Sequence, residues 1–149
     1  MTLAEVKFDL FDPRYFVVKR KGKVVRTSAS SCSYATVFGS KGFKSGVHKW
    51  KIKVVSRVHG STEQVGVVTS VHKDAACSSK QITNCGGISS GTGLQAGDIV
   101  QIVLDFKKLK VTFYKNKNLL KSQGISKKTK YYPAITCCCC ANQHFELVK

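Results

Sequence analysis

The sequence predicts an all-β protein, an antiparallel β-sandwich of two sheets. Short runs rich in Val, Ile, Phe, Tyr and Thr are interrupted by Gly, Asn, Ser and Lys, a composition typical of strands joined by turns. The chain has 2 prolines and no long segment with helical periodicity. About eight to eleven short strands must therefore bury their apolar faces on one another, because no helices are available to cover them.

Two elements of the first half of the chain are well marked. Residues 16–26 contain two short β-branched segments around a turn at Lys21-Gly22, which predicts a hairpin. Val47–Val55 is the clearest strand, because a period of two places alternating residues on opposite faces of a sheet. We expect Trp50 to be a core anchor rather than a platform for a ligand. The alternating residues are Lys49, Lys51 and Lys53 on the wet face and Trp50, Ile52 and Val54 on the buried face.

The remaining elements follow in order. Residues 64–70 form an apolar run typical of a strand covered on both sides. Residues 71–97 are rich in Ser and Gly, so we expect long loops with at most one or two weak strands, and such loops invite a functional role. Further strands are expected at Ile99–Phe106, at Lys110–Tyr114 and, after a turn at Asn116-Lys117, at Leu119-Leu120. The last two are Tyr131–Cys140, begun by Pro133 where a missing N–H is tolerated, and Phe145–Val148.

Length and charge bound the class of protein. The 149 residues predict a single domain over 1–149, with an N-terminal hairpin or extension at 1–34 and the core at 35–149. The 25 Lys and Arg against 8 Asp and Glu give a net charge of +17, which favours acidic partners. The alternative is that this charge only keeps the protein soluble. Basic residues occur on several expected elements, so a generally basic coat is a better description than one groove.

The 7 cysteines raise the question of disulfides and of zinc. Their odd number and the consecutive run Cys137–Cys140 favour a reducing compartment. Odd spacing in a strand sends Cys137 and Cys140 to opposite faces, so they cannot share one tetrahedral ion. Small buried hydrophobic residues are the simpler interpretation. The zinc alternative pairs Cys137 and Cys139 with a further ligand from Cys77, Cys85 or His144.

We expect neither catalysis nor a cofactor. The 4 histidines are scattered, and no H-E-x-x-H, G-x-S-x-G or paired-carboxylate pattern surrounds them. Asp98 follows a turn glycine and Asp105 ends a strand, positions at which a carboxylate usually accepts backbone N–H groups. The glycine-rich residues 86–93 lack the Lys-Ser/Thr ending of a phosphate loop.

Four segments, in order, resemble motifs of SPRY (B30.2-type) domains. Residues 42–52, GFKSGVHKWKI, are similar to "GF-SG-HYWEV", and residues 97–105, GDIVQIVLD, to "GDVIGVLLD". Residues 110–120, KVTFYKNKNLL, are similar to "LSFYKNGKLLG", and residues 132–135, YPAI, to "LYPAV". Val65-Gly66-Val67 forms a fifth segment between the first two. The resemblance covers roughly residues 35–149 and implies a bent antiparallel sandwich of the concanavalin-like jelly-roll type.

The sequence departs from these motifs at several positions. Lys49 replaces the second aromatic residue of "HYW", Lys51 replaces the acid of "WEV", and Lys117 replaces the Gly of "KNGK". The tryptophan that often follows "VGV" is missing, since Trp50 is the only one. The replaced positions are turn or solvent-facing, so the fold assignment stands. Partner specificity is not inherited, because it usually resides in the loops that have changed.

The resemblance implies a non-enzymatic interaction module that binds a short, acidic or polar segment of a partner protein, as an adaptor or substrate-recognition domain. Loops at one end of a rigid sandwich would bind this segment with little loss of ordering entropy. Matched to the family residue by residue, the partner-binding positions lie before the first motif, after the "VGV" strand and in the turn after the "YPAI" strand. They are Tyr34, Val71, His72, Lys73, Cys139, Cys140 and Asn142, with Ala141 in the same turn.

The alternative function is a basic scaffold that binds nucleic acid or anionic lipid without specificity. It is weakened by the absence of a nucleic-acid-binding motif with stacking aromatic residues. The first ten residues contain Glu5, Lys7 and Asp9 and no apolar signal core, and no apolar run approaches the ~20 residues of a membrane helix. We therefore expect an intracellular protein, cytoplasmic or nuclear, without a transmembrane segment.

Overall fold

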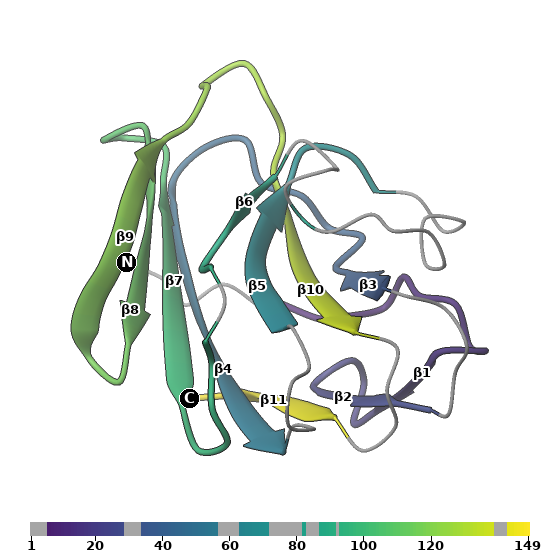
Figure 1. Ribbon diagram of the computed structural model, residues 1–149. Coiled ribbons are helices and arrows are strands. Elements are labelled where there is room, and N and C mark those ends of the chain that lie inside the picture. Colours follow the sequence, from purple (N-terminus) through teal and green to yellow (C-terminus); the bar gives the residue numbers. More distant parts are fainter. Residues whose placement is uncertain are drawn as a thin grey trace.

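The computed structural model describes residues 6–28, 34–56, 63–71, 82, 87–91, 93–138 and 143–149. These residues form eleven strands in two antiparallel sheets and no α-helix, as the sequence predicts. Within these ranges no helix is long and apolar enough to span a membrane. Figure 1 shows the larger sheet curving around the smaller one, which gives the sandwich its bent shape.

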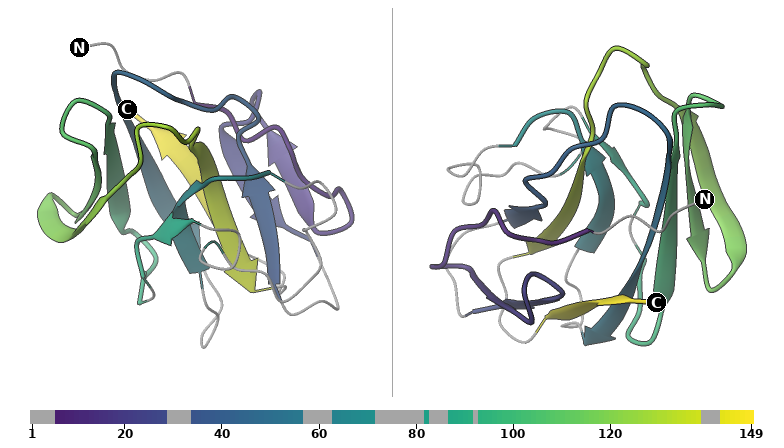
Figure 2. Two further views of the ribbon diagram at one scale, coloured as in Figure 1. Left: turned by 90° about the horizontal axis from the view of Figure 1, so that it is seen from above. Right: turned by 180° about the vertical axis from the view of Figure 1, so that it is seen from behind.

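The larger sheet has seven strands in the order β1-β2-β11-β4-β7-β8-β9. In that order they are β1 (Phe16–Lys19), β2 (Val24–Thr27), β11 (His144–Val148), β4 (Val47–Ser56), β7 (Ile99–Asp105), β8 (Lys110–Lys115) and β9 (Asn118–Gly124). The smaller sheet has four strands in the order β3-β10-β5-β6. They are β3 (Tyr34–Phe38), β10 (Tyr132–Cys138), β5 (Glu63–Val68) and β6 (Ile88–Ser89). Figure 2 shows the two sheets as separate layers.

The predicted strands are confirmed with small shifts of their ends. The hairpin of residues 16–26 is β1 and β2, and its turn places Arg20, Lys21 and Gly22 at positive φ. This hairpin is joined to the rest of the larger sheet through pairing of β2 with β11. Two differences stand out: β3 was not expected at all, and β9 extends to Gly124, well beyond Leu119-Leu120.

The hydrophobic core lies between the two sheets. The alternation in β4 is confirmed, because Trp50, Ile52 and Val54 are buried whereas the three intervening lysines are only partly covered. Trp50 is 5% exposed and belongs to the main hydrophobic cluster, so its role as a core anchor is confirmed. All six residues of β5 are buried, as expected of a strand covered on both sides.

The glycine of the Val65-Gly66-Val67 segment is required by close packing. A Cβ built on Gly66 overlaps the backbone carbonyl of Ile88 in the neighbouring strand β6. Only a residue without a side chain lets the two strands approach this closely. The glycine of this motif is therefore required because the short edge strand β6 packs closely against it. The residues of β6 lie in the Ser- and Gly-rich part of the sequence.

Strand direction defines two ends of the sandwich. At the first, which we call the Gln143 end, lie Ser56 at the end of β4, Cys138 at the end of β10, and Gln143 before β11. At the second, the Pro133 end, lie Val68 at the end of β5 and Pro133 near the beginning of β10. Binding by residues at the ends of the strands would use one of these two surfaces.

Candidate binding surface at one end of the sandwich

The structure places two of the predicted partner-binding residues at opposite ends. Tyr34 begins β3 and pairs with Cys138 at the end of β10. Val71 follows β5, whose Val68 pairs with Tyr132 at the beginning of β10. Seven residues of β10 separate the two ends, which corresponds to roughly 20 Å at about 3.3 Å per residue. Tyr34 therefore lies at the Gln143 end and Val71 at the Pro133 end, and one surface does not contain both.

The other predicted residues lie outside the described parts of the chain. They are His72, Lys73, Cys139, Cys140, Ala141 and Asn142. In the sequence, residues 139–142 connect Cys138 to Gln143, and both of these belong to the Gln143 end. Their role in binding stays a prediction.

A hollow of about 400 Å³ opens on the larger sheet at the Gln143 end. Strand register aligns one residue from each of four neighbouring strands across it. In strand order β1, β2, β11 and β4, these residues are Val17, Arg26, His144 and Ser56. Lys19 of β1 adds a further wall residue. Four strands from three separate parts of the sequence thus contribute side chains to one concave surface.

The floor of the hollow is held by a reciprocal pair of hydrogen bonds. The Thr27 backbone N–H donates to the Gln143 carbonyl oxygen at 3.0 Å, and the Gln143 N–H donates to Thr27 Oγ1 at 3.1 Å. Both residues are buried. Because these bonds fix the end of β2 against the beginning of β11, Arg26 and His144 are presented from a rigid support.

The ionisable lining of the hollow is basic. Lys19, Arg26 and His144 line it, and no acidic side chain is among its described lining residues. The nearest acid on the same strand is Glu146, whose Oε1 lies 3.0 Å from His144 Nε2. Val17 adds an apolar wall and is 42% exposed. The combination of cations with an apolar wall suits an acidic side chain that carries methylene groups.

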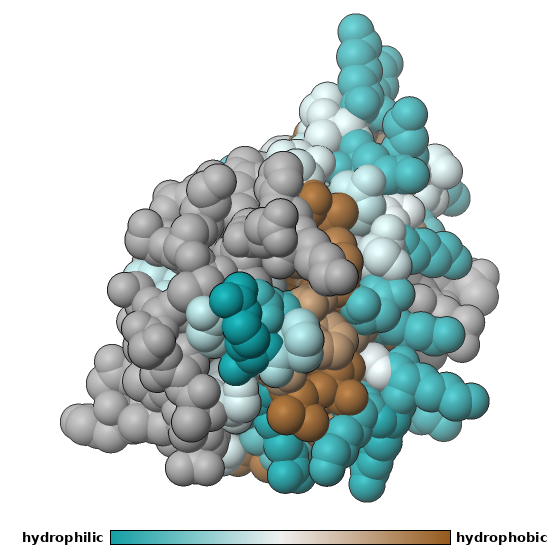
Figure 3. Space-filling model, turned by 90° about the vertical axis from the view of Figure 1, so that its right-hand side faces the viewer, coloured by the Kyte–Doolittle hydropathy of each residue, from teal (hydrophilic) through white to brown (hydrophobic). Residues whose placement is uncertain are grey.

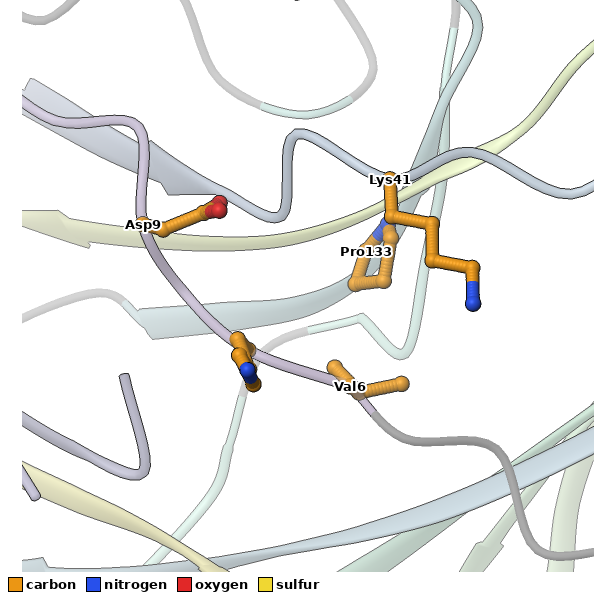
Figure 4. Close-up of a pocket in the computed structure, with 5 residues that line it drawn as sticks. Val6, Asp9, Lys41 and Pro133 are labelled. Carbon is orange, nitrogen blue, oxygen red and sulfur yellow. The ribbon is translucent and has the colours of Figure 1, made fainter. Parts of the chain in front are cut away.

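A second, smaller hollow of about 240 Å³ lies at the Pro133 end (Figure 4). It is lined by the N-terminal segment, through Val6, Lys7 and Asp9, and by Lys41 and Pro133. The Asp9 carboxylate accepts hydrogen bonds from the Ser40 backbone N–H and hydroxyl, both at 2.7 Å. This carboxylate is committed to holding the chain after β3, and its charge makes the hollow a poorer match for an acidic ligand.

A strip of hydrophobic surface lies on the side of the molecule that carries β1, β2 and β3 (Figure 3). Hydrophilic residues border it. Apolar contact area is therefore available on the side of the sandwich that the β1–β2 hairpin occupies.

Of the residues named for the zinc alternative, the structure describes Cys137 and His144. Cys137 is fully buried in the core between the sheets, as the simpler interpretation predicts. His144 instead lines the surface hollow. Among the described residues, no group of three His, Cys, Asp or Glu side chains could hold a metal ion.

Part of this surface could be predicted from the sequence. The basic hairpin residues Lys19 and Arg26 are visible as a charge cluster, and His144 is visible as an isolated histidine. Their convergence depends on β2 pairing with β11, a contact between residues more than a hundred positions apart. No pattern in a single sequence specifies which strands become neighbours in a sheet of this size.

Comparison with known proteins identifies the fold. No family model matches the sequence, and no curated protein matches it. The structure is similar to the SPRY domain of human HERC1, with a TM-score of 0.65, 19% sequence identity, and coverage of 90% of this chain and 92% of that one. It is also similar to the PSpry domain of TRIM65, with a TM-score of 0.72, 13% identity, and coverage of 99% and 91%. The chain has the fold of a SPRY-type domain.

Proposed function

We propose that this SPRY-type domain is a protein-interaction module that binds an acidic or polar segment of a partner at the Gln143 end. The hollow beside β1, β2, β11 and β4 receives an acidic side chain of that segment. Residues 1–149 act as one domain in this proposal, with a non-enzymatic adaptor or substrate-recognition role inside the cell.

The basic lining of the hollow is the observation that carries the proposal. Arg26 can form two parallel hydrogen bonds with a carboxylate, and Lys19 adds a second positive charge. The Thr27–Gln143 pair supports this surface, so little ordering accompanies binding. Positive charge over the rest of the molecule accelerates encounter with an acidic partner.

Binding of a fluorescent peptide rich in glutamate tests the proposal. The Arg26→Glu variant should bind it at least about tenfold more weakly, because a cation facing the carboxylate is replaced by a like charge. Lys127→Glu is the matched control, since Lys127 is an exposed lysine of the segment between β9 and β10 and the change in net charge is the same. An equal loss in both variants would show that only overall charge matters, and would contradict the site.

Further variants separate the two ends of the sandwich. Asn142→Ala tests the residues that connect β10 to β11 in the sequence, and the double variant His72→Ala/Lys73→Ala tests the residues that follow Val71. The proposal expects the peptide affinity to respond to the change at Asn142 and not to the changes at His72 and Lys73. The reverse pattern would move the site to the Pro133 end.

A second candidate function is non-specific binding of nucleic acid or anionic lipid, which the net charge of +17 favours. Titration with duplex DNA, single-stranded RNA and anionic vesicles at two salt concentrations distinguishes it. Sub-micromolar affinity for these polyanions at physiological salt, unaffected by Arg26→Glu, would support this second function over peptide recognition.

A further inference from the structure

We propose that the outer edge of β9 is a second docking site, at which an extended acidic segment of a partner protein adds as a strand. This site lies at the opposite edge of the larger sheet from β1 and is separate from the hollow at the Gln143 end. In Figures 1 and 2, β9 lies at the margin of the molecule.

The edge of β9 is long and has no partner strand in the described parts of the chain. β9 spans seven residues, Asn118–Gly124, and pairs only with β8. An edge strand presents unpaired backbone N–H and C=O groups, and an extended peptide can satisfy them by strand addition.

Register indicates which backbone groups face outward. The Ile125 N–H donates to the Leu109 carbonyl oxygen at 3.0 Å, so the backbone of Ile125 turns toward β8. Antiparallel strands alternate between residues that bond to one neighbour and residues that face the other side. Counting back from Ile125, Gln123 also turns toward β8, whereas the N–H and C=O groups of Ser122 and Gly124 face the free edge.

Two exposed leucines provide apolar contact at the beginning of the same strand. Leu119 is 67% exposed and Leu120 is 40% exposed. The register shifts between Phe113 and Tyr114, so Tyr114 pairs with Leu119, Phe113 pairs with Lys121, and Leu120 has no residue opposite it. Alternate side chains of an added strand would contact these leucines and gain the burial energy that backbone pairing alone does not supply.

Lys121 ties this edge to the other sheet. Its Nζ donates to the Ser89 carbonyl oxygen of β6 at 3.3 Å, so the side chain points into the sandwich. An inward-pointing lysine and a bulge are two devices that limit indiscriminate pairing of edge strands. They leave residues 121–124 as the regular part of the edge, next to a fixed positive charge.

Charge specifies the occupant. Residues 107–121 contain six lysines and no acidic residue, and the only acid after Asp105 is Glu146 of β11, which is separated from β8 by two strands, β7 and β4. A second copy of this chain carries the same net charge of +17, so electrostatic repulsion opposes its docking at this edge. A nucleic acid carries the required charge but has no peptide groups to extend the ladder. An extended segment that alternates acidic and apolar residues meets both requirements.

The test uses the full chain and a short peptide of alternating glutamate and valine. Hydrogen exchange should slow at the Ser122 and Gly124 amides when this peptide is added. Ser122→Pro removes the outward N–H and also the hydroxyl that bonds to Thr112 Oγ1 at 3.2 Å, and it should weaken binding at β9 at least about tenfold, whereas Ser122→Ala, which removes only the hydroxyl, should not. Leu120→Asp should weaken it as well.

A peptide N-methylated at alternate residues keeps its charge and loses half of its backbone N–H donors. It tests strand addition on the unmodified protein, so the test does not depend on whether Ser122→Pro folds. We expect the methylated peptide to give no protection at the Ser122 and Gly124 amides. Equal binding of the methylated peptide, or absence of protection at Ser122 and Gly124, would overturn strand addition at β9. Arg26→Glu should leave the protection at Ser122 and Gly124 unchanged, because it alters only the hollow at the Gln143 end, so that failure here and failure of the proposed function can be told apart.

Discussion

The Asn116 side chain ties the turn after β8 to Asp98 before β7, with Nδ2 donating to Asp98 Oδ1 at 2.9 Å. The same carboxamide accepts the Ile99 N–H on its Oδ1 at 2.9 Å. Asp98 Oδ2 in turn accepts the Gln95 N–H at 2.8 Å. Two of the SPRY-like motifs, residues 97–105 and residues 110–120, are therefore joined by one polar network.

Asn116→Ala should lower the free energy of unfolding by about 1–3 kcal/mol, because two hydrogen bonds are lost. Asn116 also adopts a positive φ of 51°, which asparagine tolerates better than alanine. Urea denaturation of the variant measures the change. Asn118→Ala is the control, since Asn118 is exposed, and it should change stability by no more than about 0.5 kcal/mol. A loss in Asn118→Ala as large as in Asn116→Ala would contradict the role of the network.

Gly66→Ala should destabilise the protein by about 2 kcal/mol or more, because the new methyl group overlaps the Ile88 carbonyl and forces β6 away from β5. Thermal unfolding followed by circular dichroism measures this. At Gly124 the nearest atom to a built Cβ is the Leu109 carbonyl oxygen at 3.9 Å, so Gly124→Ala should leave the melting temperature almost unchanged. Similar melting temperatures for the two variants would show that β6 is not held against β5 as described.

The hydroxyls of Thr36 and Thr136 form a buried hydrogen bond of 2.8 Å between β3 and β10. Thr36→Val should cost about 1–3 kcal/mol, because the Thr136 hydroxyl is left buried without this partner. The double variant with Thr136→Val should recover most of that loss, since both polar groups are then removed. Chemical denaturation of both variants checks this, and additive losses would mean that the two hydroxyls do not depend on each other.

Binding of a glutamate-rich peptide should weaken as ionic strength rises, because the cations that face it are partly exposed to solvent. Titration at low and at physiological salt measures the slope. Arg26→Glu should reduce this slope, whereas Lys127→Glu should leave it close to that of the parent. An affinity that does not depend on salt would mean that the peptide is held by apolar contacts instead.

The strands with clear patterning could be predicted from the sequence. Residues 49–54 alternate strictly between lysine and apolar residues, so the two faces of this strand follow from the period of two. β3 was missed because the run from Ala35 to Phe38 is buried throughout and does not alternate. β9 was underestimated because Asn118–Gly124 is largely exposed and polar, and its pairing with β8 is the only feature that defines it.

The sequence predicts which segments contribute to a binding site, but it does not predict which of these segments lie together in the fold. Tyr34 and Val71 were assigned to one surface, but β10 runs antiparallel to both β3 and β5 and places them at opposite ends. The Arg26–His144 neighbourhood could not be predicted, since it depends on which strands pair in a seven-stranded sheet. Side-chain patterning specifies which face of a strand is buried, but it does not specify which strands lie beside it in the sheet.

Photo-crosslinking locates the bound peptide on the domain. A benzophenone amino acid is placed at Val17 in the hollow, at Val71 at the Pro133 end, or at Lys127 on the segment between β9 and β10, and each variant is irradiated with the glutamate-rich peptide. We expect crosslinks from position 17 and none above background from positions 71 and 127. Crosslinks from position 71 with none from position 17 would contradict the proposed site.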